Sequence, residues 1–468
     1  MVAAPARSPT CSTCKYVFHV QAPTRYDWSQ NPPSERISAP VPARFDPSNP
    51  SSDPERRAAF RLLFLCLMAT GIGNNMLFAI LPPLARGLGV EEYWVGAIYT
   101  LSATLFMMMT PIWGALSDRH GRKPYIVFGL SAFACSTLIF AAAALAGENG
   151  WIPPLGAIFA MALARTLFGS LGSATNPAAQ AYVADRTSPE ERTEALAGLT
   201  AAFGLGAVIG PTLAATFVEW VGVAAFMVMI SVTVAAGALG IFMRLPEKTP
   251  PRAQNRPLNP LKQFAFGADP RIFPFMVYGA IIWITQSLSL STLAFFLMDR
   301  LMLDEAQGLQ LSSIALAVGA GALIVAQLVV IPALKASPRT LMTQGAVITV
   351  LGSLFMLVAP NYGGMVFGYL MTSFAFGLAR SGFVGGASVS VTPEEQGRAA
   401  GLTTATAGLG FIIGPVGGLY LFTELGMFAP YLAAAALSVV AAAVAWFHPG
   451  VARATEAVKV KPEPKAPL

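Results

Sequence analysis

The sequence predicts an all-α membrane protein whose twelve membrane-spanning helices form two related halves of six. Three observations lead to this prediction: the chain carries little charge, charge-free stretches recur along it, and part of it is repeated. Of its 468 residues, 54% are hydrophobic and only 12% are charged, whereas soluble domains usually carry about 25% charged residues. A soluble protein of this length would lack the charge to cover its surface, so we expect much of the surface to face lipid.

Charge-free stretches set the number of spans. Nine uninterrupted stretches each supply one span. Residues 153–184, which only Arg165 interrupts, supply one further span, and residues 340–391, which break in two at 360–364, supply two more. Each stretch is long enough to cross a hydrocarbon core of about 30 Å as a helix. The core of a large soluble protein would not repeat such lengths twelve times. The nine uninterrupted stretches are 62–85, 93–117, 124–147, 195–218, 220–243, 272–298, 306–334, 399–423 and 425–452.

Basic residues mark one side of the predicted bundle. With the N-terminus placed in the cytoplasm, the outer loops hold only Arg86 and Arg300. This asymmetry follows the positive-inside rule and predicts cytoplasmic termini in a bacterial-type inner (plasma) membrane. The net charge of +6 then reflects orientation rather than a nucleic-acid partner. The basic residues of the inner loops are Arg119, Arg122, Lys123, Arg186, Arg192, Arg244, Lys248, Arg252, Arg256, Lys262, Arg271, Lys335, Arg339 and Arg398.

The ends of the chain and its middle differ in composition from the spans. Residues 1–57 are rich in proline and lack apolar periodicity, so we predict a disordered N-terminal extension. The first long apolar run starts only near Phe60, so no cleavable signal peptide is expected. Cys11 and Cys14 lack a second ligand pair, so neither a metal site nor a cofactor is predicted. The expected divisions are a half at 58–244, a cytoplasmic linker at 245–271, a half at 272–448 and a cytoplasmic tail at 449–468.

An internal repeat relates the halves. Ser188-Pro-Glu-Glu-Arg192 and Thr392-Pro-Glu-Glu-Gln396 each begin a similar stretch, and both stretches continue into a Gly-Leu-Gly segment that ends in Gly-Pro. The copies lie 204 residues apart without a gap and open spans five and eleven. The chain is therefore expected to consist of two halves in the same orientation, an arrangement found in transporters with parallel repeats.

The loop between spans two and three carries the most specific motif, Gly114-Ala-Leu-Ser-Asp118-Arg119-His-Gly121-Arg122-Lys123. It resembles the signature loop of the major facilitator superfamily, which implies a cytoplasmic gate that latches when the transporter faces outward. We expect Gly114 to permit close helix approach and Gly121 a tight turn. Asp118 is placed to meet the positive end of a neighbouring helix. Arg122 and Lys123 are also explained by a simple positive-inside anchor, and the equivalent loop 335–339 has lost the pattern.

Small residues and prolines mark spans five and eleven. Small residues four apart expose backbone for close packing, and proline kinks a helix, so a packing role is expected. The first copy also resembles the antiporter motif of the drug:proton antiporter (tetracycline and multidrug efflux) branch of the superfamily, which implies export. The residues concerned are Gly206, Gly210, Pro211, Gly410, Gly414 and Pro415.

Two arginines lie within predicted spans. A charge at the bilayer centre costs roughly 2.5–3.5 kcal/mol on insertion scales, so such residues are seldom retained without a partner. Arg165 resembles the span-four arginine of the superfamily, and Arg380 has no counterpart in the first half. Either can line a cavity, contact substrate or pair with a polar group. The resemblance implies that spans one, four, seven and ten line the substrate cavity, which selects Asn74, Asn75, Arg165, Gln286 and Arg380. The neutral members of this set can also act as interhelical glue.

The acidic residues set limits on the mechanism. All 24 of them fall at span ends, in loops or in tails, so no titrating carboxylate is expected within the cavity. This weakens proton-coupled export of cations, and unpaired arginines favour an anionic substrate. Proton coupling can still run through Asp118, Asp185 or the substrate itself.

The leading functional hypothesis is an ion-coupled secondary transporter that exports a small amphipathic molecule by alternating access. The alternatives are an organic-anion or metabolite carrier that uses Arg165 and Arg380, and a non-transporting membrane sensor. The chain has no Gly-x-x-x-x-Gly-Lys-Ser/Thr phosphate loop, so an ATP-driven pump is excluded. No set of nucleophile, base and orienting acid suggests an enzyme. The expected partners are the substrate, a coupling proton and the bilayer, and we expect a monomer.

Overall fold

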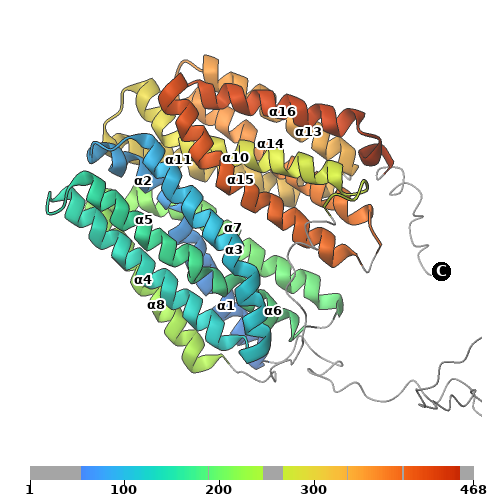
Figure 1. Ribbon diagram of the computed structural model, residues 1–468, viewed down its shortest axis with the longest axis horizontal. Helices are drawn as coiled ribbons and strands as arrows, with labels where there is room; N and C mark the ends of the chain where they lie inside the picture. Colours follow the sequence, from blue (N-terminus) through green and yellow to red (C-terminus); the bar gives the residue numbers. More distant parts are fainter. Residues whose placement is uncertain (1–53, 188, 246–266, 335, 393–394, 454–468) are drawn as a thin grey trace, which may run out of the picture. The chain divides into compact units, whose positions relative to one another are not determined.

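The computed structural model describes residues 54–187, 189–245, 267–334, 336–392 and 395–453. Within these ranges the chain is helical and contains no β-strand. Twelve of its helices are long and apolar enough to cross a membrane. The prediction of an all-α protein with twelve membrane-spanning helices is therefore confirmed (Figure 1).

The first six spans contain two interruptions. Span one is interrupted at Met76, and span four contains a short 3-10 segment that begins at Gly172. The six spans are α1 (Pro54–Asn75) with α2 (Leu77–Gly87), α3 (Glu92–His120), α4 (Lys123–Glu148), α5 (Pro154–Ser170) with η2 (Gly172–Ala174) and α6 (Thr175–Ala184), α7 (Pro189–Val221), and α8 (Val223–Arg244).

The last six spans contain one interruption, a π-helical segment in span eight. The six spans are α10 (Phe273–Leu301), α11 (Glu305–Val325) with η3 (Ala326–Val330) and α12 (Ile331–Leu334), α13 (Pro338–Val358), α14 (Tyr362–Val389), α15 (Gln396–Leu425), and α16 (Ala429–Phe447).

The first helix begins earlier than the sequence boundary placed it. α1 starts at Pro54, inside the range 1–57 that was assigned to the extension. Proline is favoured in the first helical turn, and Glu55 complements the helix dipole there. The remainder of that extension, residues 246–266 of the predicted linker and residues 454–468 of the predicted tail lie outside the described residues.

Each span crosses once, so the connections alternate between two ends of the bundle. We call the end at which α1 begins and α16 ends the near end; it also carries Gly121, Asp185 and the connection from span eight to span nine. The opposite, far end carries 88–91, 149–153 and 302–304. At the far end the start of α11 is capped locally, since Asp304 accepts a hydrogen bond from Gln307 N at 2.7 Å.

The repeat positions perform the same packing in both halves. A Cβ atom on Gly206 would lie 2.5 Å from Ile72 N of α1, and one on Gly410 would lie 2.6 Å from the carbonyl carbon of Trp283 in α10. Spans five and eleven thus approach the first helix of their own half with backbone against backbone. The repeat reaches to Gly222 and Gly426, also 204 residues apart, which follow these spans with positive φ angles of 80° and 93°.

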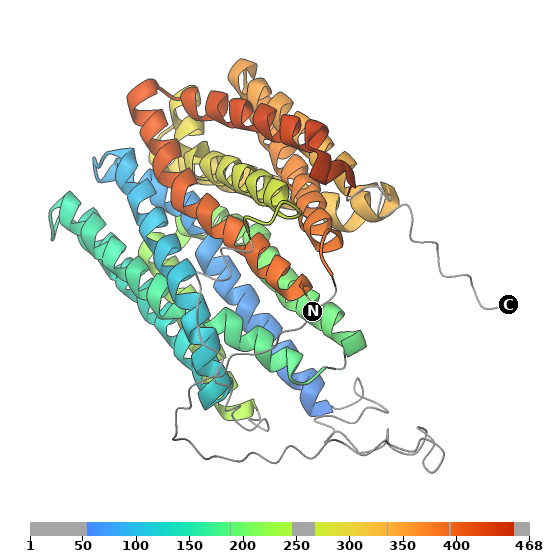
Figure 2. The ribbon, with the colours of Figure 1, turned by 45° about the vertical axis from the view of Figure 1, so that its right-hand side comes forward.

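Contacts between the halves run through α3 with α15, α7 with α11, and α2 with α10 and α11 (Figure 2). Thr100 Oγ1 donates to the carbonyl of Ile412 at 2.8 Å. A Cβ on Gly96 would lie 2.8 Å from the carbonyl oxygen of Pro415. At the far end Arg86 of span one forms an ion pair with Asp299 of span seven. These contacts hold the halves together on the far side of the bundle.

Candidate functional site

Arg165 of α5 is buried in the first half, with 7% of its surface exposed. Its Nη2 donates to Asn74 Oδ1 at 3.0 Å, and its guanidinium lies 4.3 Å from the centre of the Phe168 ring. Its Nε is buried and has no hydrogen-bond partner. Among the described residues no carboxylate pairs with it. Arg165 therefore keeps one donor free for an acceptor group within the membrane region.

The two adjacent asparagines behave differently. α1 ends at Asn75, and both residues are half-buried next to the helix interruption at Met76. Asn74 binds Arg165, whereas the Asn75 side chain donates to the carbonyl of Gly71 in its own helix at 2.9 Å. The structure thus brings Asn74 and Arg165 together and gives Asn75 a local partner.

Arg380 of α14 lies against an aromatic ring rather than an acid. It is half-buried, and its guanidinium is 5.5 Å from the centre of the Trp283 ring of α10. No hydrogen bond or ion pair links Arg380 to another residue of the described ranges. Gln286, half-buried, lies one helical turn beyond Trp283 on α10. Trp283 thus contacts Arg380 and lies one helical turn from Gln286.

A chain of aromatic rings joins these positions across the two halves. Phe78 of α2 stacks on Tyr99 at 4.6 Å and reaches Phe411 of α15 at 6.5 Å. Trp283 lies 5.8 Å from Phe411 and 4.7 Å from Phe376 of α14. We call these five residues the aromatic cluster. The sequence analysis did not single out Tyr99 or Phe411.

The near-end loop is organised around Arg122. Only 8% of its side chain is exposed, and it pairs with Asp118 and, at 3.1 Å, with Asp185 at the end of α6. Its Nη1 also donates to Ser117 Oγ at 3.0 Å. The interpretation of Arg122 as a surface anchor is incomplete, because a buried arginine that binds two carboxylates ties spans two and four together.

The two glycines of this loop differ in their geometry. Gly121 has a φ of 102°, which permits the tight turn that the sequence predicted. A Cβ on Gly114 would lie 3.6 Å from Pro177 Cβ, an ordinary contact, so close approach does not require glycine there. Arg119 is exposed, and Lys123 Nζ lies 5.6 Å from the Phe242 ring.

Twelve apolar spans, an arginine buried within them and an aromatic cluster between two repeated halves define a polytopic membrane protein of the transporter class. No group of three or more histidine, cysteine or acidic side chains that could hold a metal occurs in the part of the chain that the structure describes.

A family model for the Major Facilitator Superfamily matches residues 63–388 and 333–468. The chain therefore belongs to the major facilitator superfamily, and it is a transporter rather than an enzyme.

Relatives of known name agree with this assignment. Multidrug resistance protein 2 of Bacillus subtilis is 25% identical over 396 residues, which cover 82% of this chain and 94% of that protein. Tetracycline resistance protein, class H, of Pasteurella multocida is 28% identical over 155 residues, covering 32% of this chain and 36% of that protein. The match to human solute carrier family 67 member A1 is 29% identical over 194 residues and covers 41% of this chain and 44% of that protein. The chain thus resembles drug-efflux transporters and spans less than half the length of that human relative.

Solved structures share the fold. A bacterial homologue of the human lysosomal transporter Spinster, in an inward-facing and occupied conformation, superposes with a TM-score of 0.64 at 17% identity, covering 87% of this chain and 98% of that one. A mutant of the nucleoside transporter NupG gives a TM-score of 0.67 at 15% identity, covering 83% of this chain and 98% of that one.

Proposed function

We propose that this transporter exports small amphipathic molecules from the cytoplasm by alternating access. The observation that carries the proposal is the aromatic cluster, because it joins spans from both halves and supplies apolar rings that varied ligands can contact when the halves move apart. The multidrug and tetracycline resistance proteins among the relatives support the same direction of transport. In this proposal the near end faces the cytoplasm, as the positive-inside rule predicts.

In the proposed cycle the halves rock about the aromatic cluster. The far-end contacts of Arg86, Thr100 and Gly96 belong to the state that is closed to the outside. Their separation opens the far end, while the near end closes and Asp118 latches it. Pro211 and Pro415 lie inside spans five and eleven, where the missing backbone hydrogen bond lets those helices bend during the exchange.

The proposed coupling proton binds at the near end, at Asp118 or Asp185. Both carboxylates contact Arg122, so protonation of either one weakens an attraction that holds the loop. Coupling at this place does not require a carboxylate within the cavity.

A second candidate function is transport of organic anions. The observation that favours it is the pair of arginines without carboxylate partners among the described residues, of which Arg165 keeps a buried, unbonded Nε. A carboxylate or sulfonate would accept charge-assisted hydrogen bonds from such groups.

Transport in sealed proteoliposomes tests both candidates. The probes are ethidium as a cation and fluorescein as an anion, each with and without an imposed proton gradient. Arg165→Ala and Arg380→Ala are compared with Arg244→Ala, which removes an exposed near-end arginine outside the site. Movement of ethidium that survives Arg380→Ala supports export of amphipathic molecules. Movement of fluorescein alone, abolished by either site change and retained in Arg244→Ala, supports the anion carrier. If neither probe moves, the export proposal fails and the sensor hypothesis gains.

A further inference from the structure

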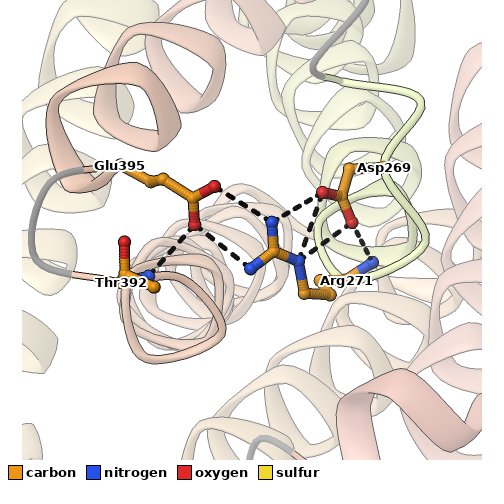
Figure 3. A network of polar contacts seen from close by, with 4 residues as sticks. All are labelled: Asp269, Arg271, Thr392 and Glu395. Atoms are coloured by element: carbon orange, nitrogen blue, oxygen red, sulfur yellow. Dashed lines mark hydrogen bonds and ion pairs between the residues drawn. The ribbon is translucent and has the colours of Figure 1, made fainter.

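Two arginine–glutamate pairs occupy matching places at the near end. Arg56, at the start of α1, donates from Nη1 to Glu191 Oε2 at 3.2 Å. Arg271, directly ahead of α10, donates from Nη1 and Nη2 to the two carboxylate oxygens of Glu395, each at 3.1 Å (Figure 3). The glutamates are equivalent in the repeat, at its spacing of 204 residues. The arginines do not lie at that spacing. The two pairs therefore occupy equivalent places in the fold, although only their glutamates are equivalent in the repeat.

The second pair is part of a wider polar network. Asp269 accepts from Arg271 Nε at 3.1 and 3.2 Å and from Nη2 at 2.8 Å. Glu395 Oε2 also accepts from the backbone nitrogen of Thr392 at 3.2 Å. Figure 3 shows the guanidinium of Arg271 held between the two carboxylates. Hydrogen bonds from Arg271, followed by backbone hydrogen bonds, lower the pKa of both carboxyl groups, which keeps them charged at neutral pH.

The first pair is more buried. Only 8% of the Arg56 side chain is exposed, whereas 46% of the Arg271 side chain is exposed. Arg56 Nη1 also donates to the carbonyl of Arg186 at 3.1 Å, so it connects the start of span one with the segment between spans four and five.

Each pair adds a second attachment between helices that already touch. Span five packs on span one through Gly206, and span eleven packs on span seven through Gly410. Gly210 and Gly414 extend these contacts toward the far end, and Ile272 packs with Ala399 and Leu402 at the near end of spans seven and eleven. The ion pairs add a polar attachment at the near end, where separation of the helix ends would have to begin. Spans five and eleven also contact the opposite half, and spans one and seven carry Asn74 and Trp283 of the candidate site.

We propose that the two ion pairs, the near-end clasps, make the near-end segments of spans one and five, and of spans seven and eleven, move as rigid couples during transport, while spans five and eleven bend further along, at Pro211 and Pro415. Each clasp thereby positions a helix that carries candidate site residues relative to a helix that contacts the opposite half. This role in the cycle rests on the proposed alternating access, whereas the tether itself is a property of each half.

Spin-label distances in lipid nanodiscs test the tether without any substrate. Labels at Phe273→Cys and Thr404→Cys, both exposed positions on α10 and α15, report the near-end separation of spans seven and eleven after the four native cysteines are replaced. Arg271→Glu and Glu395→Arg are each expected to increase the population at longer distance at least twofold. The double variant should restore the distribution of the wild type in part, because Asp269 repels the glutamate that replaces Arg271 but can attract the arginine that replaces Glu395. Arg244→Glu, a charge reversal at the same end, should leave the distribution unchanged. The tether would be overturned if the single variants gave the same distance distribution as Arg244→Glu. It would also be overturned if the double variant kept the longer distances of the single variants.

Salt distinguishes the two clasps. Raising the salt concentration from 0.1 to 1 M shortens the Debye length from about 10 to about 3 Å. The exposed Arg271 clasp should loosen at high salt. Labels at Leu65→Cys and Thr200→Cys on α1 and α7 should report no change for the buried Arg56 clasp. A distance between spans seven and eleven that does not respond to salt would contradict an ionic tether.

Ethidium efflux separates the clasps from the proposed function. If the wild type moves no ethidium, the export proposal fails, and the spin-label distances alone decide whether the ion pairs tether the helices. If the wild type exports ethidium and the single variants separate their helices yet keep the wild-type rate, the clasps have no role in the cycle.

Discussion

Replacement of Gly206 by alanine tests the central packing contact between spans one and five. The added Cβ would lie 2.5 Å from Ile72 N, 2.6 Å from the Gly71 carbonyl carbon and 2.7 Å from Gly71 Cα. These are backbone atoms that cannot rotate away, so the two helices must separate. Overpacking of this kind costs about 1–3 kcal/mol, while exchange of a helical glycine for alanine contributes about 0.5–1 kcal/mol in the other direction. The net expectation is a destabilisation of up to about 2.5 kcal/mol.

The chain offers a matched control two residues away on the same helix. A Cβ on Gly204 would meet nothing within 4 Å, so Gly204→Ala receives only the gain in helix propensity. The apparent unfolding midpoint in detergent, followed by tryptophan fluorescence, should fall for Gly206→Ala and stay or rise for Gly204→Ala. The repeat predicts the same contrast between Gly410→Ala, whose Cβ would lie 2.5 Å from Trp283 Cβ, and Gly417→Ala, which has open space. Equal midpoints for Gly206→Ala and Gly204→Ala would refute the close-packing argument.

Three further predictions concern polar contacts. Asn74→Ala should lower the unfolding midpoint by the equivalent of about 1–3 kcal/mol, because it leaves Arg165 without its hydrogen-bond acceptor; an unchanged midpoint would mean that Arg165 finds another partner. Asp299→Asn should open the far end of the bundle, and spin-label distances across the far end measure this opening. In a double-mutant cycle the coupling energy between Asp299→Asn and Arg86→Gln should be at most about 1 kcal/mol, since both side chains are partly exposed. Additive effects of the two substitutions would argue against the ion pair. The two carboxyl groups bound by Arg271 have pKa values below their ordinary 3.8 and 4.5, so their contribution is complete above about pH 4.5 and is lost as the pH falls through the lowered values. The midpoint difference between wild type and Arg271→Gln should therefore be constant above that pH and shrink in stronger acid, and a difference that persists there would contradict the assignment.

Much of the fold could be predicted because the bilayer imposes simple requirements on a sequence. A helix that crosses lipid must be apolar over about twenty residues, so charge-free stretches reveal the number of spans directly. The repeat between 188–211 and 392–415 likewise predicted equivalent spans, since related sequences form related helices. Gly206 and Gly410 were recognised as packing residues, and the structure places both against the backbone of the first helix in their half.

The partners of the polar residues could not be predicted in the same way. Sequence reasoning placed Asn74, Asn75 and Arg165 in one region, but only the packing of span one against span four decides which asparagine meets the arginine. Phe411 was overlooked because an aromatic residue in an apolar span carries no signal of its own. Its contacts depend on how span eleven lies against span seven.

The sequence by itself determined the family, the number of spans and the loop motif, because these depend on composition and local spacing. The tertiary structure decided which charges meet: Arg122 with Asp185, and Arg56 and Arg271 with the equivalent glutamates of the repeat. Such pairs join residues far apart in the chain. Their formation depends on distances of a few ångströms between helix ends, which no local pattern specifies.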